Sequence, residues 1–328
     1  MKALKTLVSS KKSLTIEQLA NNAGCWMALS QYTLIIIEGP DAEKFLQGQC
    51  TCDISDSRDN NIISGAHCNP QGRMLNSFIL VQLDTEKFAL RVHQSIAAQA
   101  LADFQKYIVF SKAEARLEEN IALIGFYQAP AGLIPSAAST SSSVSQTTFG
   151  WILAHDQEQI EVWASETQLE EISERLSSEQ FSTIAMANSH QWDLLNIRKG
   201  LGDVREQTRG ELLPQDINLQ LTGGVSFSKG CYTGQEIVAR MHYKATLKKH
   251  MYRASIESDD SILPGASLIN VDTGKTVGSV IYSAPSKSGQ IELLAMCKDD
   301  FTSAENALSV SPSNNKLMWL PLPYAIPK

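Results

Sequence analysis

Apolar residues in this chain occur in short runs that alternate with turn residues, and this pattern limits what the chain can fold into. The longest runs, Leu34–Ile37 and Phe78–Val81, have the length of a strand, and none approaches the roughly 18 residues of a membrane-spanning helix. Hydrophobic residues make up 43% of the 328 positions, which is enough to fill globular cores. The pattern excludes a collagen, a coiled coil and a disordered chain, and it argues against a protein that spans a membrane.

The first part of the chain mixes strand and helix patterns. Apolar runs bounded by turn residues predict strands at 32–37, 78–83 and 88–92. Asp41 is the predicted N-cap of a helix that begins at Ala42. Apolar residues at helical spacing predict a second helix over 95–109.

The region 117–187 has the pattern of a small α+β subdomain. Strands are expected at 121–126, 150–154 and 160–164. A capping box at Thr167–Glu170 predicts a helix that ends at about 177. We expect the stretch Ala131–Thr148, which is rich in Ser, Thr and Ala, to be a loop.

From about residue 245 onward, short apolar runs alternate with turns at regular spacing. Strands are predicted at 252–256, 267–271, 277–282 and 291–296, an arrangement typical of a small β-barrel or sandwich. Before them we expect short helices at 192–199, stopped by Gly200, and at 235–241, with mostly loop over 211–231. Together these patterns predict an α+β chain of about two or three domains.

Charge and cysteine content narrow the functional classes. The chain has 28 basic and 35 acidic residues, a net charge of −7, which excludes a globally basic nucleic-acid binder. Residues Met1–Lys12 carry four lysines and lack the apolar core of a signal peptide. Six cysteines are too few for a disulfide scaffold of this length. We therefore expect reduced thiols in the cytoplasm.

The densest candidate site is the segment Lys229–Glu236, which reads K-G-C-Y-T-G-Q-E. Gly230 and Gly234 bracket Cys231 and permit a close backbone approach to a ligand. Lys229 and the start of the predicted helix at 235 would both favour the thiolate of Cys231, the reactive form of the group. The alternative is a buried structural thiol in a tight loop.

Other candidates are less specific. Cys50-Thr51-Cys52 and His67-Cys68 do not have the ligand spacing of a zinc site, and we predict no metal. Trp26 and Trp192 offer faces on which a flat heteroaromatic ligand could stack, or they fill the core.

Several motifs of the chain resemble those of a known family. The octet Lys229–Glu236 is similar to the signature of the YgfZ family of folate-binding proteins. The resemblance extends over nearly the whole chain through five further segments: Gly39–Thr51, Ala66–Met74, Ser189–Gly200, Leu213–Phe227 and Pro321–Tyr324.

The resemblance implies a fold related to the T-protein (aminomethyltransferase) of glycine cleavage, with three domains in a ring around a folate-binding channel. The implied division is 1–116 with 188–244 as the folate-binding domain, 117–187 as a small ferredoxin-like subdomain, and 245–328 as a C-terminal β-barrel. It also implies tetrahydrofolate or a derivative as the bound cofactor, with Trp26 and Trp192 as folate contacts and Cys231 as the functional thiol.

The same resemblance implies a function. The chain would support iron–sulfur enzymes, including the radical enzyme that methylthiolates certain tRNAs, and would not itself be a classical enzyme. The alternative is a folate-dependent one-carbon transferase. Two departures from the T-protein pattern bear on this choice: Asn76 and Ser77 stand where adjacent aspartates are expected, and Arg198 stands where a glutamate would hold the pterin. Neutral residues cannot supply the missing carboxylate, so glycine-cleavage chemistry is not expected.

Direct tRNA binding is a third hypothesis. A basic run follows the cysteine motif and could contact phosphates, although such a run is usually a solvated face. Its members are Arg240, His242, Lys244, Lys248, Lys249, His250 and Arg253.

Overall fold

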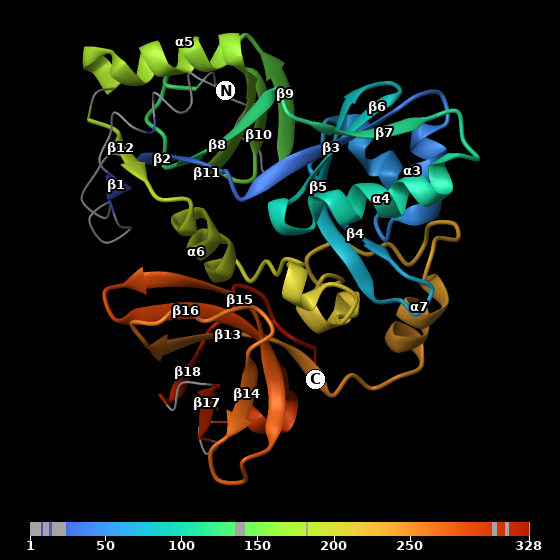
Figure 1. The fold of residues 1–328 in the computed structure, drawn as a ribbon, viewed down its shortest axis with the longest axis vertical. Helices are drawn as coiled ribbons and strands as arrows, with labels where there is room; N and C mark the ends of the chain where they lie inside the picture. The colour runs from blue at the N-terminus through green and yellow to red at the C-terminus, as the bar shows by residue number, and fades with distance from the viewer. Residues whose placement is uncertain are drawn as a thin grey trace. The chain divides into compact units, whose positions relative to one another are not determined.

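The computed structural model confirms the α+β class and divides the chain into two compact units (Figure 1). It describes residues 8, 13–14, 24–134, 142–181, 183–303, 307–311 and 315–327. Unit 1 comprises Met1–Glu43, Ile54–Ile63 and Ile79–Trp192, and unit 2 comprises Lys44–Asp53, Ser64–Phe78 and Asp193–Lys328. The expected division into three domains stays a prediction.

A seven-stranded sheet forms the larger part of unit 1, with strand order β1-β12-β2-β8-β11-β10-β9. Its strands are β1 (Ser13–Leu14), β2 (Cys25–Ala28), β8 (Ile121–Tyr127), β9 (Ser143–Thr147), β10 (Gly150–Ala154), β11 (Gln159–Ser165) and β12 (Ala185–Ala187). Helix α5 (Glu166–Ser177) and the 3-10 turn η3 (Glu179–Phe181) follow β11. The sheet thus takes β2 from far upstream in the chain, next to β8.

The two faces of this sheet are covered differently. Side chains directly opposite each other in antiparallel strands share a face, so Trp26 and Phe126 share one face, and Met27 and Gly125 share the other. The first face packs against α5 and forms a buried apolar core (Figure 1). Besides Trp26 and Phe126, this core includes Ile124, Ile152, Val162, Leu169, Ile172 and Leu176.

The second face of the sheet is approached by Trp192 from helix α6 (His190–Arg198). A Cβ atom on Gly125 would lie 2.5 Å from Cε3 of Trp192, so the indole can lie on the sheet only because residue 125 is glycine. Asn188 caps the helix: its Oδ1 accepts a hydrogen bond from the backbone N–H of His190 at 3.1 Å. The cap at Asn188 and the glycine at position 125 together fix the position of Trp192 on the sheet.

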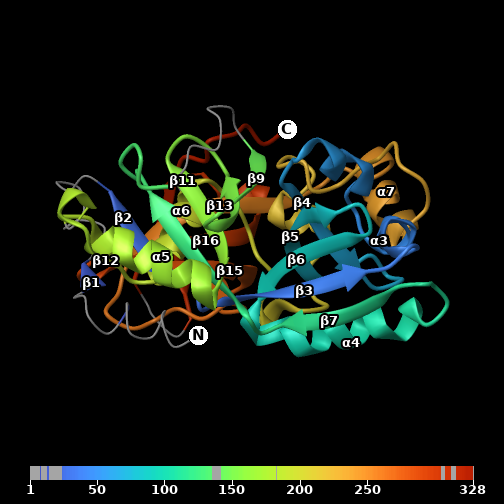
Figure 2. The same ribbon diagram turned by 90° about the horizontal axis from the view of Figure 1, so that it is seen from above.

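Unit 1 also contains an antiparallel group in which β3 (Tyr32–Glu38) lies between β6 (Lys87–His93) and β7 (Glu114–Glu118). Helix α4 (Ala97–Ile108) packs on β7 and β3 (Figure 2). The five-stranded sheet has the order β4-β5-β6-β3-β7, and the boundary between the units falls within β5 (Met74–Asp84). Strand β4 (Ile63–Cys68) belongs to unit 2 from Ser64 onward, and the remaining elements of unit 1 are the 3-10 turns η1 (Ile54–Asp59) and η2 (Gln94–Ile96).

Unit 2 is built on a six-stranded sheet of order β17-β14-β15-β16-β13-β18. Its strands are β13 (Lys249–Glu257), β14 (Ser267–Asn270), β15 (Thr276–Lys287), β16 (Gln290–Lys298), β17 (Leu308–Val310) and β18 (Leu317–Leu320). The edge strands are β17 and β18, yet Ser309 forms a bridge with Lys316, so the sheet curls back on itself as a half-barrel. This confirms the predicted C-terminal barrel-like region.

Helices α3 (Ala42–Gln49) and α7 (Gln235–Tyr243) begin where the sequence predicts them. The short 3-10 turns are η4 (Glu206–Thr208), η5 (Pro214–Ile217) and η6 (Asp299–Phe301). Gly200 ends α6 in the left-handed conformation (φ 67°), as predicted.

Three details differ from the sequence predictions. The predicted loop Ala131–Thr148 contains strand β9, and its residues 135–141 lie outside the described ranges. The capping box of α5 lies two residues earlier than predicted: the Gln168 side chain accepts from the backbone N–H of Ser165 at 2.9 Å. Strands β2, β4, β7 and β12 were not predicted. Each is short or carries polar residues that interrupt the alternation of apolar and polar positions typical of a strand.

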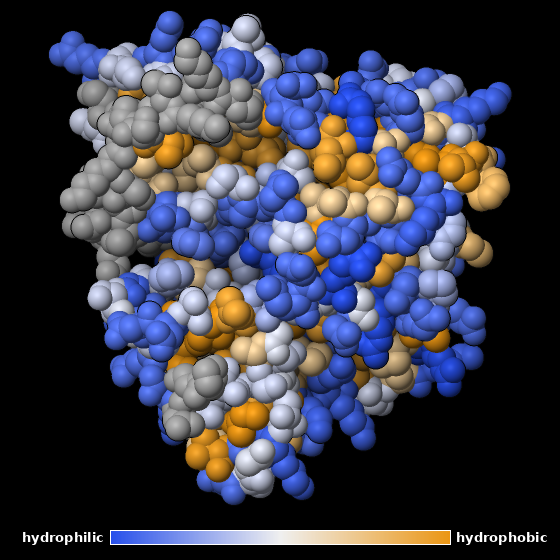
Figure 3. Space-filling model, viewed as in Figure 1, coloured by the Kyte–Doolittle hydropathy of each residue, from blue (hydrophilic) through white to orange (hydrophobic). Residues whose placement is uncertain are grey.

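The surface seen in Figure 3 is mainly hydrophilic, with separate apolar patches, one of them over the end of α4. The exposed side chains there are Val109 and Phe110, which are 71% and 88% exposed. Among the described residues, no helix combines the length and the apolar character needed to cross a membrane.

Gly125→Ala tests the close approach of Trp192 to the sheet. The added methyl group would overlap the indole, and we expect a loss of about 1–3 kcal/mol in the free energy of unfolding, the usual cost of overpacking. Gly48→Ala in α3 is the control: no atom lies within 4 Å of its added Cβ, so it should be neutral or stabilising. Denaturant unfolding measures both. Equal stability of the two variants would contradict the packing argument.

Candidate functional site

Cys231 is the exposed thiol among the six cysteines, which are all free. Burial raises the pKa of Cys25, Cys68 and Cys297 to about 12 and raises that of Cys50 well above its ordinary value. Those thiols stay protonated and inaccessible. Cys231 is therefore the cysteine that can meet a reagent, a ligand or a partner from solution.

The loop that presents Cys231 is fixed to the segment Gly48–Cys52. Thr51 Oγ1 donates to the carbonyl oxygen of Gly224 at 2.6 Å, and the backbone N–H of Ser226 donates to the carbonyl oxygen of Thr51 at 2.8 Å. On the far side of the cysteine, the backbone N–H of Thr233 donates to the carbonyl oxygen of Gly48 at 3.2 Å. Cys231 thus lies on a loop that is held on both sides.

Lys229 is buried beneath this loop and bonds to backbone, not to the thiol. Its Nζ donates to the carbonyl oxygens of Cys50 at 2.9 Å and Cys52 at 2.6 Å. Burial lowers its pKa, while the nearby thiols act in the opposite direction. A buried ammonium needs such acceptors, so Lys229 acts as an anchor of the loop. The support of the Cys231 thiolate by Lys229 stays a prediction.

The end of the motif packs closely on the hairpin turn Asn69–Arg73. Gly234 caps α7 in the left-handed conformation (φ 85°), and a Cβ there would lie 2.5 Å from the carbonyl oxygen of Asn69. Gly72 (φ 73°) faces the side chain of Ile237 in α7. Gly72 and Gly234 thus lie against each other, which explains why both segments need a residue without a side chain at these positions.

Trp26 and Trp192 are both buried, at 0% and 1% exposure, but they lie on opposite faces of the seven-stranded sheet. A single ring therefore cannot lie against both. Each indole Nε1 is buried without a hydrogen-bond partner among the described residues. A buried donor without a partner costs about 1–3 kcal/mol, so both positions fit a ligand that supplies an acceptor.

The Trp192 face carries a buried charged cluster that sequence reasoning missed. Glu161, fully buried in β11, accepts hydrogen bonds from Arg91 at 2.8 Å, Trp163 Nε1 at 2.6 Å and His155 Nε2 at 3.1 Å. Burial would raise the pKa of Glu161, but Arg91 and the other donors hold it below its ordinary value. The signal that could have revealed it is a lone carboxylate inside the apolar strand Q-I-E-V-W.

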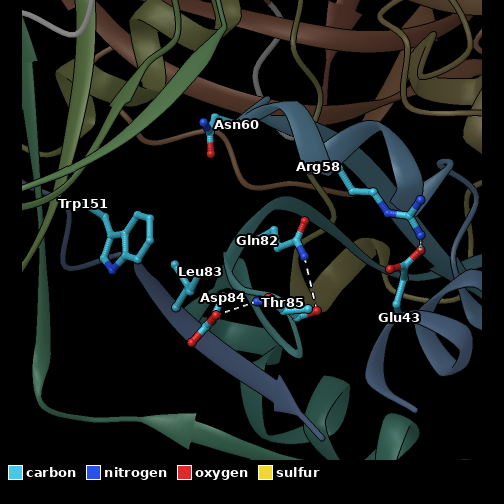
Figure 4. A pocket seen from close by; sticks show the side chains of 8 residues that line it. All are labelled: Glu43, Arg58, Asn60, Gln82, Leu83, Asp84, Thr85 and Trp151. Carbon is cyan, nitrogen blue, oxygen red and sulfur yellow. Dashed lines mark hydrogen bonds and ion pairs between the residues drawn. The ribbon is translucent and has the colours of Figure 1, made fainter. Parts of the chain in front are cut away.

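A hollow in unit 1 has a volume of about 530 Å³ and lies between the β5–β6 turn and Trp151 (Figure 4). Its polar groups largely satisfy one another. Arg58 pairs with Glu43 at 2.5 Å, Gln82 donates to the carbonyl oxygen of Thr85, and Asp84 accepts from the N–H of Thr85. The hollow lacks a convergent set of free polar groups, the mark of a binding site.

The two departures from the T-protein pattern lie in unit 2. Asn76 is fully buried, and neither amide atom has a hydrogen-bond partner in the described part of the chain. Ser77 donates to Asp203 at 2.6 Å and accepts from the backbone N–H of Val204. Arg198 forms an ion pair with Glu292 at 2.9 Å, a carboxylate that it shares with Arg253.

Three residues of the basic run after the cysteine motif lie beside carboxylates in the structure. Lys249 pairs with Asp216 at 3.0 Å, His250 lies 2.9 Å from Asp299, and Arg253 pairs with Glu292 at 2.7 Å. Lys249 and Arg253 are thus already paired with carboxylates inside unit 2, which leaves fewer cations of this run to meet phosphates. Within the described ranges, no three His, Cys, Asp or Glu side chains are grouped to hold a metal ion.

Comparison with known proteins places these features in a family. Residues 16–168 match the model of the GCVT N-terminal domain. The chain is 31% identical over 312 residues to the tRNA-modifying protein YgfZ of Escherichia coli O157:H7, covering 92% of this chain and 93% of that one. YgfZ of Klebsiella pneumoniae is also 31% identical over 312 residues, with the same coverage. The crystal structure of aminomethyltransferase T of the glycine cleavage system from Bartonella henselae shares the fold, with a TM-score of 0.73, 15% identity, and coverage of 97% of this chain and 88% of that one.

Glu161→Gln tests the buried cluster through pH. Because the folded-state pKa is depressed, the stabilisation is complete above the unfolded pKa of about 4.3 and is lost as the pH falls through the folded value. We expect the variant to be about 3–5 kcal/mol less stable at pH 7, since Arg91 loses its buried partner, and the gap to narrow below pH ~4.3. Urea unfolding between pH 7 and pH 3 measures this.

Glu118→Gln is the control for that experiment, because its pair with Arg116 is partly exposed and should contribute about 0–1 kcal/mol. A constant difference between wild type and Glu161→Gln at every pH would contradict an ionised Glu161.

Proposed function

Because the chain belongs to the YgfZ family of tRNA-modifying proteins, we propose that it is a folate-binding accessory factor for iron–sulfur enzymes and thereby supports tRNA methylthiolation. The observation that carries this proposal is the exposure of Cys231 on an anchored loop, while the other five cysteines are buried. The proposed client is the radical enzyme that methylthiolates tRNA. The proposed site of action is the cytoplasm, where thiols stay reduced.

Tetrahydrofolate or a derivative is the proposed ligand, and it would supply a one-carbon or redox-active group. Two residues of this chain fit it, since Trp26 and Trp192 each hold a buried indole N–H without a partner. A folate ring offers a flat face for stacking and nitrogen and oxygen acceptors for such donors. We place the ring against Trp192, because the second face of the sheet carries buried polar groups beside that indole.

Trp26 remains a predicted folate contact with a separate test. It lies within the apolar core beneath α5, on the other face of the sheet. A ligand that reached Trp26 would have to enter that core. Folate contact at Trp26 and folate contact at Trp192 are therefore separate hypotheses. Substituting each tryptophan in turn tests on which face of the seven-stranded sheet folate binds.

Cys231 is proposed to act as a nucleophile or a transient ligand toward the client's sulfur or iron. A single thiolate supplies one of the four ligands of a usual iron–sulfur cluster, so any cluster would be shared with the client. Lys229 is proposed to support the thiol indirectly: its bonds to Cys50 and Cys52 carbonyls hold the loop in place. Effects on tRNA would then arise through the client, without tight direct binding of tRNA.

Substitution of the tryptophans tests the folate site. We expect Trp192→Phe to weaken tetrahydrofolate binding about tenfold, because it removes the indole N–H donor and part of the stacking surface. Trp26→Phe should change the free energy of unfolding more than the affinity, since Trp26 packs in the α5 core. Isothermal titration calorimetry gives the affinities. Unchanged affinity in both variants would refute the site, and a loss confined to Trp26→Phe would place the ligand on the α5 face.

Substitution of Cys231 tests the function in the cell. In a strain that lacks the chromosomal copy, wild type should restore methylthiolated adenosine in tRNA and Cys231→Ser should restore less than about a tenth of it, because the hydroxyl is not ionised at neutral pH. Mass spectrometry of tRNA nucleosides measures the modification. Ser228→Ala, on the exposed part of the same loop, is the control and should restore it fully.

The experiment requires that the three proteins accumulate equally, which immunoblotting checks. Full restoration by Cys231→Ser would make the thiol structural. Normal methylthiolation in the deletion strain itself would reject the proposed role.

A further inference from the structure

His155 joins the buried carboxylate of Glu161 to the indole of Trp192. It follows the last residue of β10, and its Nε2 lies 3.1 Å from Glu161 Oε2. Its ring meets the Trp192 ring edge to face, with centroids 5.9 Å apart and planes at 69°. All three residues belong to unit 1. The imidazole is thus the contact through which a buried charge can orient the proposed folate-binding indole.

We propose that His155 is a positioning residue that holds Trp192 in the orientation that receives folate. This inference rests on the proposed function, in which Trp192 contacts folate. It assigns His155 no contact with the ligand. The imidazole acts by limiting the orientations of the indole before the ligand arrives, which lowers the entropic cost of binding.

The carboxylate determines the orientation of the imidazole. Glu161 is ionised, because its pKa is held below the ordinary value, and an ionised carboxylate only accepts hydrogen bonds. His155 Nε2 must therefore carry the proton and donate to Glu161. That single donor fixes the plane of the ring, and the plane determines which edge of the imidazole faces Trp192.

Glu161 can orient His155 because its neighbours hold the carboxylate in place. Arg91 and Trp163 donate to its two oxygens, and the guanidinium of Arg91 lies 4.1 Å from the centre of the Tyr32 ring. The carboxylate is fully buried, so water does not compete for it. His155 is its most accessible partner, at 17% side-chain exposure.

The indole of Trp192 is confined from two directions. Gly125 lets the indole approach the sheet closely, and His155 makes an edge-to-face contact with the same ring system. The indole N–H takes no part in either contact and stays without a partner among the described residues. The arrangement therefore orients the ring and leaves its donor available.

Two substitutions separate the ring of His155 from its hydrogen bond. His155→Gln keeps a donor for Glu161 and removes the ring, whereas His155→Phe keeps the ring and removes the donor. An edge-to-face aromatic contact contributes an amount that corresponds to about a three- to tenfold change in affinity. We expect His155→Gln to weaken tetrahydrofolate binding by about that factor and His155→Phe to weaken it less. His155→Phe should also lower the unfolding midpoint, because the buried Glu161 loses a donor.

A readout without ligand keeps this test independent of the proposed function. The near-ultraviolet circular dichroism of Trp192, taken as the difference between wild type and Trp192→Phe, reports the surroundings of the indole. We expect His155→Gln to reduce that band and His242→Gln, in unit 2, to leave it unchanged.

An unchanged Trp192 band in both His155 variants overturns the positioning role, whatever folate does. Wild-type folate affinity in His155→Gln, with affinity lost in Trp192→Phe, also overturns it and leaves the proposed function standing. If the band changes while Trp192→Phe binds folate normally, the folate site fails and the contact between His155 and Trp192 stands.

Discussion

The buried pair between Arg91 and Glu161 is the interaction on which the architecture of unit 1 depends. Arg91 belongs to β6 and Glu161 to β11, so one 2.8 Å contact joins the two sheets of the unit. An isolated carboxylate in such a place would cost several kcal/mol. The cost is offset because Arg91, His155 and Trp163 all donate to the two carboxylate oxygens. Removing any donor therefore affects the packing of the sheets and the surroundings of Trp192 together.

Unit 2 uses a buried cation in a comparable way. The ammonium of Lys229 has two backbone carbonyls as partners, so it holds the segment around Cys50 and Cys52 against the cysteine loop. Cys50 and Cys52 in that segment are buried, whereas Cys231 on the loop is exposed. In both units the ordered position of a functional side chain depends on a buried charge that belongs to a neighbouring residue.

Most regular elements followed from local pattern, whereas the pairings between distant segments did not. Strand β3, helix α5 and strands β13 to β16 of unit 2 were predicted because turns bound their apolar runs, whereas β17 and β18 were not predicted. Strand β9 was missed because Ser-Val-Ser-Gln-Thr reads as a loop until it pairs with β10. The exposure of Cys231 agrees with its motif. The cluster of Arg91, His155 and Glu161 could not be predicted, because 70 residues separate Arg91 from Glu161 in the sequence.

The fold shared with aminomethyltransferase T does not by itself determine the chemistry. Two positions at which we predicted a departure from the T-protein pattern bear on it. Where a free carboxylate is expected, Asn76 is neutral and Ser77 is bonded to Asp203. A carboxylate is therefore present in that region: Asp203 accepts a hydrogen bond from Ser77 at 2.6 Å and lies 3.6 Å from Arg205. Arg198 cannot accept hydrogen bonds from the ring N–H groups of a pterin. Its guanidinium pairs with Glu292, which also pairs with Arg253. In the described part of the chain, positions 76 and 77 thus supply no carboxylate, while Cys231 presents an accessible thiol. This combination favours a factor that acts on a partner through Cys231 over a one-carbon transferase.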